Sequence, residues 1–238
     1  MFFKSDRSHL DHAPVSNARL NSLRAAVLGA NDGIVSVSSI ILGVAGATDS
    51  RTAIFAAGIA GLVAGALSMA VGEFVSVSSQ RDAERMYVRV EKYRLEHHPE
   101  EEFEELASVF EGKGLSAKTA HQVARELTEH DAVRAHLDAE FNLNEEDLSS
   151  PVAAAIASLV AFTIGGLIPL VTVIVVNHSL RLMTTFIAVL GALVVTGYLS
   201  ATVGRAPRPR AIARVVLGGA VAMLITYGAG HLFGQIIR

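Results

Sequence analysis

The stretch "LGANDGIVSVSSIILGVAGA", Leu28 to Ala47, has the length and apolar character of a membrane-spanning helix, yet it carries Asp32 near its start. About 20 predominantly apolar residues are enough to cross the hydrocarbon core of a bilayer. A carboxylate inside such a helix costs roughly 2.5–3.5 kcal/mol on insertion scales, and intramembrane acids generally mark ion paths or proton relays. The stretch therefore predicts a membrane protein in which Asp32 has a functional role.

Apolar residues are gathered into five long runs, in a chain of 238 residues that is 51% hydrophobic and 18% charged. The predicted spans lie near residues 25–47, 53–79, 151–176, 180–203 and 211–236. The predicted fold class is all-α, a polytopic membrane protein with five transmembrane helices and a helical insertion between helices 2 and 3. No short apolar core with a cleavage site precedes the first run, so we expect the first span to remain as its own anchor.

Positive charges beside the spans predict the orientation of the chain. Eight of them flank the first span or lie between spans four and five: Lys4, Arg7, Arg19, Arg24, Arg205, Arg208, Arg210 and Arg214. The 1–2 and 3–4 loops hold only Arg51 and Arg181. We therefore expect the N-terminus and the insertion to be cytoplasmic, and the C-terminus to lie outside.

The insertion is strongly acidic. Residues 80–150 hold 18 Asp and Glu against 9 Lys and Arg, a net charge of −9, whereas the whole chain has a net charge of −3. The predicted organisation is a cytoplasmic N-terminal segment (1–24), transmembrane helices 1–2 (25–79), an acidic metal-binding helical domain (80–150) and transmembrane helices 3–5 (151–238). A solvated helical hairpin remains the alternative interpretation of the acidic segment.

Caps and helix breakers predict the local structure of the insertion. The predicted helices cover residues 79–98, 99–114, 117–131 and 132–141, the first of them continuing span two. Pro99 ends that first helix and starts the second, and Ser116 caps the third. Helical spacing predicts that Ala120, Val123 and Leu127 face inward.

Carboxylates and imidazoles of the insertion lie at metal-ligand spacing. Hard divalent cations take carboxylate oxygens, and Fe²⁺ and Mn²⁺ also accept imidazole. Glu102 and Glu105 share one helix face at i,i+3, and His136 and Glu140 share another at i,i+4. The candidate ligands are Glu91, Glu96, His97, His98, Glu101, Glu102, Glu105, Glu126, Glu129, His130, His136, Asp138 and Glu140. Because such pairs are also common on solvated helices, spacing alone does not decide for a metal site.

Several chemistries lack their motifs. The chain has no cysteine, which excludes disulfides and thiolate metal sites. No Glu-x-x-His pair supports a di-iron ferroxidase, and no glycine-rich phosphate loop supports ATP-driven pumping. We expect no enzymatic activity, no cofactor other than a transported or bound Fe²⁺ or Mn²⁺, and no nucleic-acid partner.

The second span adds two candidates to Asp32. Met69 and Glu73 lie one turn apart, and a thioether beside a carboxylate can pass on a borderline-soft cation such as Fe²⁺. Packing against lipid or the core is the alternative for Met69. For Glu73 the alternative is an end-of-span carboxylate that reaches cytoplasmic water.

Three motifs resemble a known family. "LRAAVLGANDGIVSVSSIILGVAGA" in span one, "AGALSMAVGEFVSVSSQRDAE" in span two and "GGLIPL" in span three are similar to the vacuolar iron transporter family, in its bacterial form. The resemblance implies a homodimer in the lipid of the cell (inner) membrane. It also implies the exchange of cytosolic Fe²⁺, and often Mn²⁺, for protons along a path between the two subunits.

The resemblance also assigns site residues. Asp32 and Met69 match the translocation site of the family, and its cytoplasmic glutamates fall at positions 91, 102, 105 and 140 of this sequence. Four positions depart from the plant members: Arg94 and Gly61 replace acids, and His136 and Leu137 replace methionines. We therefore expect a different cytoplasmic ligand set, completed by Glu101, His136 or Asp138.

These inferences give one preferred function and one alternative. The preferred function is a proton-coupled transporter that moves Fe²⁺ or Mn²⁺ out of the cytosol. Its metal-site residues are Asp32, Met69, Glu73, Glu91, Glu102, Glu105, His136 and Glu140. The alternative is a membrane-anchored metal sensor or buffer without transport.

Overall fold

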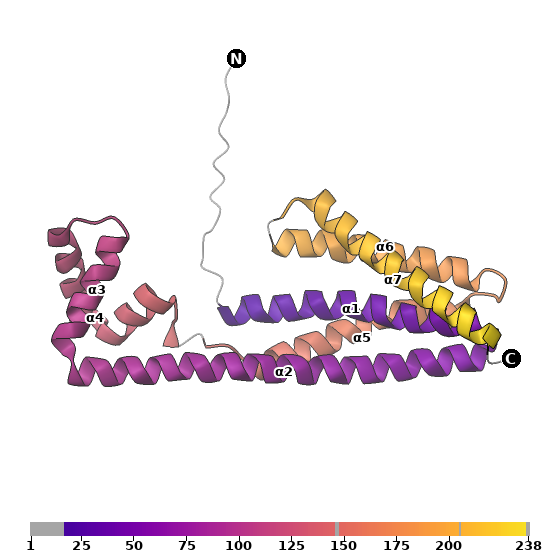
Figure 1. The fold of residues 1–238 in the computed structure, drawn as a ribbon, viewed down its shortest axis with the longest axis horizontal. Helices are drawn as coiled ribbons and strands as arrows, with labels where there is room; N and C mark the ends of the chain where they lie inside the picture. Colours follow the sequence, from indigo (N-terminus) through magenta and orange to yellow (C-terminus); the bar gives the residue numbers. More distant parts are fainter. Residues whose placement is uncertain (1–16, 146–147, 205, 237–238) are drawn as a thin grey trace, which may run out of the picture.

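The computed structural model describes residues 17–145, 148–204 and 206–236, and the elements of secondary structure in these residues are helices joined by short connections. Seven helices follow one another: α1 (Asn17–Ala47), α2 (Arg51–His97), α3 (Pro99–Gly112), α4 (Ala117–Phe141), α5 (Pro151–Val175), α6 (Arg181–Val203) and α7 (Arg208–Ile236) (Figure 1). Within these residues α1, α2, α5, α6 and α7 are long and apolar enough to cross a membrane. The predicted fold class is confirmed: the chain is a multi-pass, all-helical membrane protein. Residues 1–16 of the predicted N-terminal segment lie outside the described residues, and residues 17–24 belong to α1.

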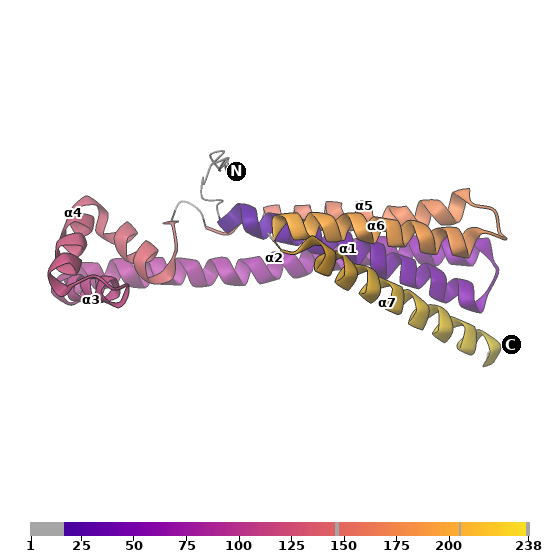
Figure 2. The same ribbon diagram turned by 90° about the horizontal axis from the view of Figure 1, so that it is seen from above.

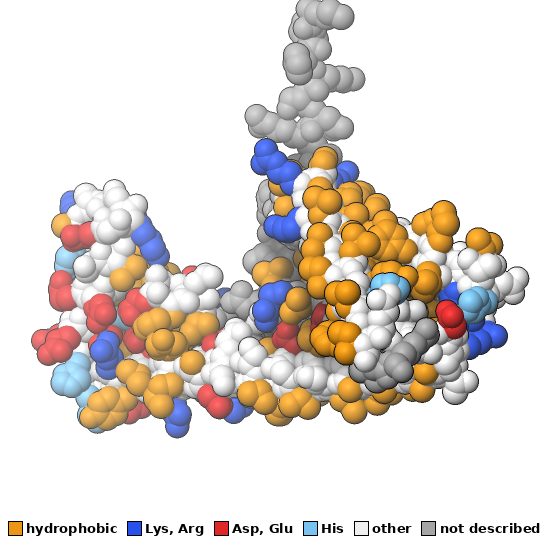
Figure 3. All heavy atoms as spheres, turned by 45° about the vertical axis from the view of Figure 1, so that its right-hand side comes forward, with side chains coloured by type: hydrophobic (Ala, Val, Ile, Leu, Met, Phe, Trp, Pro, Cys, Tyr) orange, Lys and Arg blue, Asp and Glu red, His pale blue; other side chains and the backbone are white. Residues whose placement is uncertain are grey.

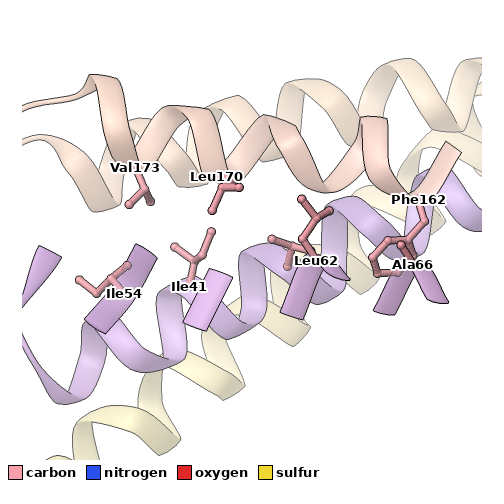
Figure 4. Packing of buried hydrophobic residues seen from close by; sticks show 8 residues of the cluster. Ile41, Ile54, Leu62, Ala66, Phe162, Leu170 and Val173 are labelled. Carbon is pink, nitrogen blue, oxygen red and sulfur yellow. The ribbon is translucent and has the colours of Figure 1, made fainter. Parts of the chain in front are cut away.

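Helix α1 lies at the centre of the membrane bundle, where it packs against α5, α7, α2 and α6 (Figure 2). Glycines permit its closest approach to α5: a Cβ on Gly29 would lie 2.6 Å from the carbonyl oxygen of Ser158, and one on Gly33 would meet the backbone of Phe162. The core between α1, α2 and α5 contains Ile41, Leu62 and Phe162 (Figure 4). Small residues thus bring the helix that carries Asp32 against two neighbouring spans.

Helix α2 extends far beyond the membrane bundle. It has 47 residues, which corresponds to about 70 Å at 1.5 Å per residue, and it runs along the whole molecule (Figure 1). Its apolar run ends near residue 79, and no proline or glycine interrupts the polar part that follows until Pro99. The polar part of α2 therefore projects from the membrane and carries α3 and α4 at its far end. Together with α3 and α4, the part of α2 beyond residue 79 forms the helices of the acidic insertion predicted for residues 80–150.

The turns of the insertion follow its caps and breakers. Pro99 stands in the first turn of α3, and the Ser116 side chain accepts a hydrogen bond from the Thr119 N–H at the start of α4. Helix α4 is broken at Asp131, whose extended backbone (φ −163°) interrupts the helix and whose Oδ1 accepts from the Arg134 N–H at 3.0 Å. Asp131 thus acts as the N-cap of a second segment, which corresponds to the predicted fourth helix.

One prediction about the packing of this domain is wrong. Of the three residues expected to face inward, Ala120 is fully buried and Val123 is half-buried, whereas Leu127 is 36% exposed. Ala124, which was not predicted, is also fully buried. Helices α3 and α4 meet through a cluster built on Leu106, Ala107 and Ala124. Ala124 belongs to this cluster and Leu127 does not, so α3 covers a different part of α4 from the one predicted.

The two ends of the membrane bundle differ. The α1–α2 and α5–α6 connections lie at the end away from α3 and α4, whereas the start of α1 and the α6–α7 connection lie at the end that faces the insertion (Figures 1 and 2). The space-filling view has hydrophobic side chains over the bundle and acidic side chains gathered at the α3–α4 end (Figure 3). The strongest negative charge is therefore held outside the membrane part.

Candidate metal centre

Four side chains from three helices meet inside the insertion. Glu91 comes from α2, Glu102 from α3, and His136 with Glu140 from the second segment of α4. Each can offer one ligand atom such that all four atoms lie within 4.8 Å of one another. We call these four residues the inner group. Spacing along the sequence predicted only one of its pairs, His136 with Glu140.

The local fold explains how the inner group assembles. At His98 and Pro99 the chain turns away from α2 at a steep angle, and the first turn of α3 stays beside the last turns of α2, with Arg94 Nη1 3.8 Å from Glu102 Oε1 (Figure 1). After the break at Asp131, the second segment of α4 packs on α2, and the rings of Tyr87 and Phe141 stack with centroids 4.8 Å apart. This contact holds the end of α4 against α2, with the His136 and Glu140 face turned toward Glu91.

The inner group is buried and short of hydrogen-bond partners. His136 Nδ1 lies 2.9 Å from Glu140 Oε1, 3.1 Å from Glu91 Oε1 and 3.7 Å from Glu102 Oε2, and the four side chains are between 0% and 10% exposed. This nitrogen makes a hydrogen bond with Glu140, whereas Glu91 Oε1, Glu102 Oε2 and His136 Nε2 are buried without a partner. Such orphaned atoms are rare in native proteins. A bound cation would satisfy the two carboxylate oxygens.

The proton affinities in the inner group reflect the crowding of its carboxylates. Burial raises the pKa of Glu91 from 4.5 to about 7, and the charges of Glu140 and Glu102 add to this rise. Burial also raises the pKa of Glu140, against the opposing effect of its hydrogen bond with His136. A divalent cation would relieve both the burial penalty and the mutual repulsion, because it replaces a proton with two positive charges.

The donor set indicates which ion could bind. Three carboxylates and one imidazole suit Fe²⁺ or Mn²⁺, since both accept oxygen and nitrogen ligands. The described donors include no thioether or thiolate, so the inner group offers nothing that favours a soft ion such as Cu⁺.

The other predicted ligands of the insertion lie outside the inner group. Glu105 is 48% exposed, and its Oε2 lies 3.6 Å from Arg94 Nη1. Glu101 is exposed and lies 3.8 Å from His98, and Asp138 is also exposed. Of the three residues proposed to complete the site, the structure brings only His136 into the group.

The membrane candidates occupy one level of the bundle. Asp32 is half-buried on α1, and its Oδ1 accepts a 2.6 Å hydrogen bond from Ser36 Oγ. Met69 on α2 packs against the core cluster that contains Phe162. Because Phe162 touches α1 at Gly33 and α2 at Gly65, Asp32 and Met69 lie within about one turn of the same level.

Glu73 lies one turn beyond Met69, toward the insertion. It is 7% exposed, its Oε2 has no hydrogen-bond partner, and Arg24 Nη2 lies 3.7 Å away. At 1.5 Å per residue, about 27 Å of α2 separates Glu73 from Glu91. The inner group and the membrane candidates are thus separate places joined by one continuous helix.

Sequence reasoning missed Glu84, a buried carboxylate between these two places. Its Oε2 accepts from the Ser149 N–H at 3.0 Å, and its Oε1 accepts from Ser149 Oγ and Gln80 Nε2, both at 2.8 Å. Asn21 Nδ2 also donates to Ser149 Oγ at 3.1 Å. Ser149 belongs to the connection that returns from α4 to α5. Its hydrogen bonds with Glu84 hold this connection against α2, and its hydrogen bond with Asn21 holds it against α1. Glu84 lies seven residues before Glu91 and therefore on the same face of α2. This spacing does not distinguish a metal ligand from a carboxylate that accepts structural hydrogen bonds.

The fold and this geometry define a class of protein: a multi-pass membrane protein that carries a buried carboxylate–imidazole group on the continuation of one span. The model of the VIT family matches residues 23–231, and the chain belongs to this family. The family prediction is confirmed at this level.

Curated relatives agree with the family match. A vacuolar iron transporter of Acanthamoeba castellanii is 40% identical over 211 residues, which cover 88% of this chain and 78% of the relative. Vacuolar iron transporter homolog 2 of Arabidopsis thaliana is 38% identical over 213 residues, which cover 89% of this chain and 84% of the relative. Vacuolar iron transporter homolog 5 of Oryza sativa subsp. japonica is 40% identical over 217 residues, which cover 91% of this chain and 82% of the relative. The family is one of transporters and not of enzymes, as predicted, whereas the bacterial form stays a prediction because these relatives are eukaryotic.

Proposed function

We propose that the protein transports Fe²⁺ across its membrane, out of the cytosol and in exchange for protons, with Mn²⁺ as a possible second substrate. The observation that supports this most directly is the inner group: three buried carboxylates and an imidazole, with unpartnered atoms, on the helix that continues into the span with Met69 and Glu73. The relatives are named as a vacuolar iron transporter and vacuolar iron transporter homologues, which favours iron as the substrate.

In this proposal the ion is collected outside the membrane and then passes through the bundle. Glu91, Glu102, His136 and Glu140 collect it, whereas Glu105 pairs with Arg94 outside the inner group. Asp32 and Met69 bind it within the membrane, and Glu73 passes ions or protons at the mouth of the path. Asp32 is tolerated in span one because a dication neutralises it during transport and a proton neutralises it afterwards. Competition between metal and proton for the same carboxylates couples the two fluxes.

The arrangement of the two ends supports the proposed orientation in the cell (inner) membrane. The start of α1, the α6–α7 connection and the insertion all lie at one end of the bundle (Figure 1). The basic residues Arg24, Arg208 and Arg210 belong to this end, and short connections rich in arginine favour the cytoplasmic side. The insertion then faces the cytosol, from which it can take up metal, and the C-terminus lies outside.

A homodimer with the ion path between its subunits agrees with the exposed surface of α2. On its membrane part Val63, Leu67 and Val71 are 53–63% exposed, and on its continuation Met86 and Tyr93 are 51% and 59% exposed. Lipid can cover the first set, whereas the second set lies on the polar part of α2, beyond its apolar run. An apolar stripe of this kind outside the membrane is the usual mark of a protein partner.

The experiment that tests the function is metal uptake into inside-out vesicles that contain the protein. Fe²⁺ should accumulate when the vesicle interior is more acidic than the medium, and unlabelled Mn²⁺ should compete. Asp32→Asn should abolish uptake while the protein stays folded, because the amide keeps the volume but loses the charge that attracts the dication. Asp49→Asn is the matched control, since Asp49 is 87% exposed in the α1–α2 loop. Uptake by Asp32→Asn at the wild-type rate would remove Asp32 from the path.

The alternative is a membrane-anchored sensor or buffer. The separation of about 27 Å between the inner group and Glu73 favours it, because the inner group could bind metal without any membrane path. Metal binding without flux, under either direction of the pH gradient, would support this alternative and contradict transport.

A further inference from the structure

Arg94 lies directly beside the inner group. Its Nη1 is 3.8 Å from Glu102 Oε1 and 3.6 Å from Glu105 Oε2. The two oxygens of Glu102 therefore face different groups: Oε1 faces the guanidinium, whereas Oε2 lies 3.7 Å from His136 Nδ1 and has no hydrogen-bond partner. Glu102 is 5% exposed, so both of its oxygens must be compensated within the protein.

Helix geometry divides these side chains into two layers. Arg94 follows Glu91 by three residues on α2, and Glu105 follows Glu102 by three residues on α3, so each pair shares a helix face. The inner layer is the buried group. The outer layer is the ion pair of Arg94 and Glu105, whose side chains are 46% and 48% exposed. Glu102 belongs to both layers, because it contributes one oxygen to each.

The guanidinium faces both of the oxygens that a second metal ion would need. An ion that bridged Glu102 Oε1 and Glu105 Oε2 would have to lie within about 2.3 Å of both oxygens. Arg94 Nη1 already lies within 4 Å of both. Arginine stays protonated at every physiological pH, so its charge cannot be removed to admit another cation.

We propose that Arg94 is a resident cation that limits the insertion to one metal ion per chain and keeps Glu105 out of the coordination shell. This inference rests on the proposed role of the inner group as a metal site. A single dication leaves one negative charge on the three inner carboxylates, and the guanidinium faces this charge across Glu102. The outer layer therefore carries the fixed positive charge of the Arg94 guanidinium, in place of a metal ion that could exchange with the solution.

The test is the metal stoichiometry of the full-length protein in detergent, measured with Mn²⁺ by calorimetry and native mass spectrometry. The wild type should bind one Mn²⁺ per chain. Arg94→Glu should bind two, because the new carboxylate joins Glu105 and Glu102 Oε1 in the outer layer. The two ions would share Glu102, so the electron paramagnetic resonance spectrum of this variant should show spin coupling that the wild type lacks.

Lys92→Glu is the matched control. Lys92 lies on the same helix, is 44% exposed and pairs with Glu145 at 2.8 Å, away from the inner group. The substitution changes the net charge by the same amount as Arg94→Glu, so a purely electrostatic gain of metal would appear in both variants. Lys92→Glu should keep one Mn²⁺ per chain without spin coupling.

Glu105→Gln supplies a second test that does not depend on the folding of Arg94→Glu. If Glu105 lies outside the coordination shell, this variant should bind Mn²⁺ within about twofold of the wild-type affinity, whereas Glu91→Gln should bind at least tenfold more weakly.

Three results would overturn the role of Arg94 while leaving the metal site in place. They are two ions per wild-type chain, one ion in folded Arg94→Glu, or a tenfold loss of affinity in Glu105→Gln. Wild-type protein that binds no Mn²⁺, or that binds it unchanged after Glu91→Gln, would overturn the metal site itself and with it this inference.

Discussion

Glu91→Gln should make the metal-free insertion more stable at alkaline pH while removing its response to metal. In the packed insertion, burial raises the pKa of Glu91 to about 7, with further contributions from Glu140 and Glu102, whereas Arg94 lowers it. When the insertion opens, the pKa of the Glu91 carboxyl returns to its ordinary value of 4.5. The packed form therefore binds this proton more tightly, so its stabilising effect is complete below about pH 4.5 and is lost as the pH rises through about 7.

The size of the effect follows from the two pKa values. Their difference corresponds to at most roughly 3 kcal/mol of local stability, at about 1.4 kcal/mol per pH unit. Of this, roughly 1.3 kcal/mol falls between pH 6 and pH 8, which is about a tenfold change in the local opening constant. Glutamine has nearly the same volume and cannot ionise, so the variant should lose this pH dependence.

Hydrogen exchange followed by mass spectrometry can measure the effect on full-length protein with a chelator present. After correction for the intrinsic exchange rates, the α3 and α4 peptides of the wild type should be about tenfold less protected at pH 8 than at pH 6. In Glu91→Gln they should be equally protected at both values, and at pH 8 better protected than in the wild type. Added Mn²⁺ should protect the wild type at pH 8 but not the variant.

Glu101→Gln is the control, because Glu101 is 82% exposed at the start of the same helix α3. It should leave the exchange pattern and its pH dependence unchanged. If Glu91→Gln instead lost protection at pH 8, the ionised carboxylate would be a structural partner like Glu84, and the interpretation of the inner group as a site strained by its own charges would be refuted.

Three further predictions concern other parts of the molecule. Glu84→Ala should leave the buried Ser149 N–H unpaired, at a cost of about 1–3 kcal/mol, and so speed hydrogen exchange at 148–150 more than Glu84→Gln, which still accepts through its amide oxygen. Gly33→Ala should lower the thermal unfolding temperature of the bundle, because its Cβ would meet the backbone of Phe162, whereas Gly218→Ala, with no atom within 4 Å, should not. His136→Ala should weaken Mn²⁺ binding in calorimetry at pH 7 at least tenfold, and an unchanged affinity would exclude the imidazole as a ligand.

The membrane part of the fold could be predicted from the sequence because the bilayer imposes a length. Runs of apolar residues near 25–47, 151–176 and 180–203 correspond closely to α1, α5 and α6. The continuity of α2 was also predictable, since no helix breaker occurs between Glu73 and Pro99. In these segments the local sequence and the environment demand the same structure, so no tertiary contact was needed to choose between alternatives.

Packing between helices was less predictable. Helical spacing predicted that Leu127 faces inward, but the cluster between α3 and α4 contains Ala124 and leaves Leu127 exposed. Periodicity identifies a face that is more apolar than the rest. It does not tell which part of that face the neighbouring helix will cover, because this depends on how closely the two backbones can approach.

The sequence by itself determined that this protein is helical, that five segments cross a membrane, and that an acidic insertion rich in candidate ligands follows the second span. Only the tertiary structure decided which carboxylates meet. Glu84 and Glu91 lie seven residues apart on one face of α2, yet Glu84 accepts hydrogen bonds from Ser149 while Glu91 faces two glutamates and His136. Spacing along one helix fixes only the face on which a side chain lies. Its partner depends on where the turn at Pro99, the break at Asp131 and the return to α5 place the other helices.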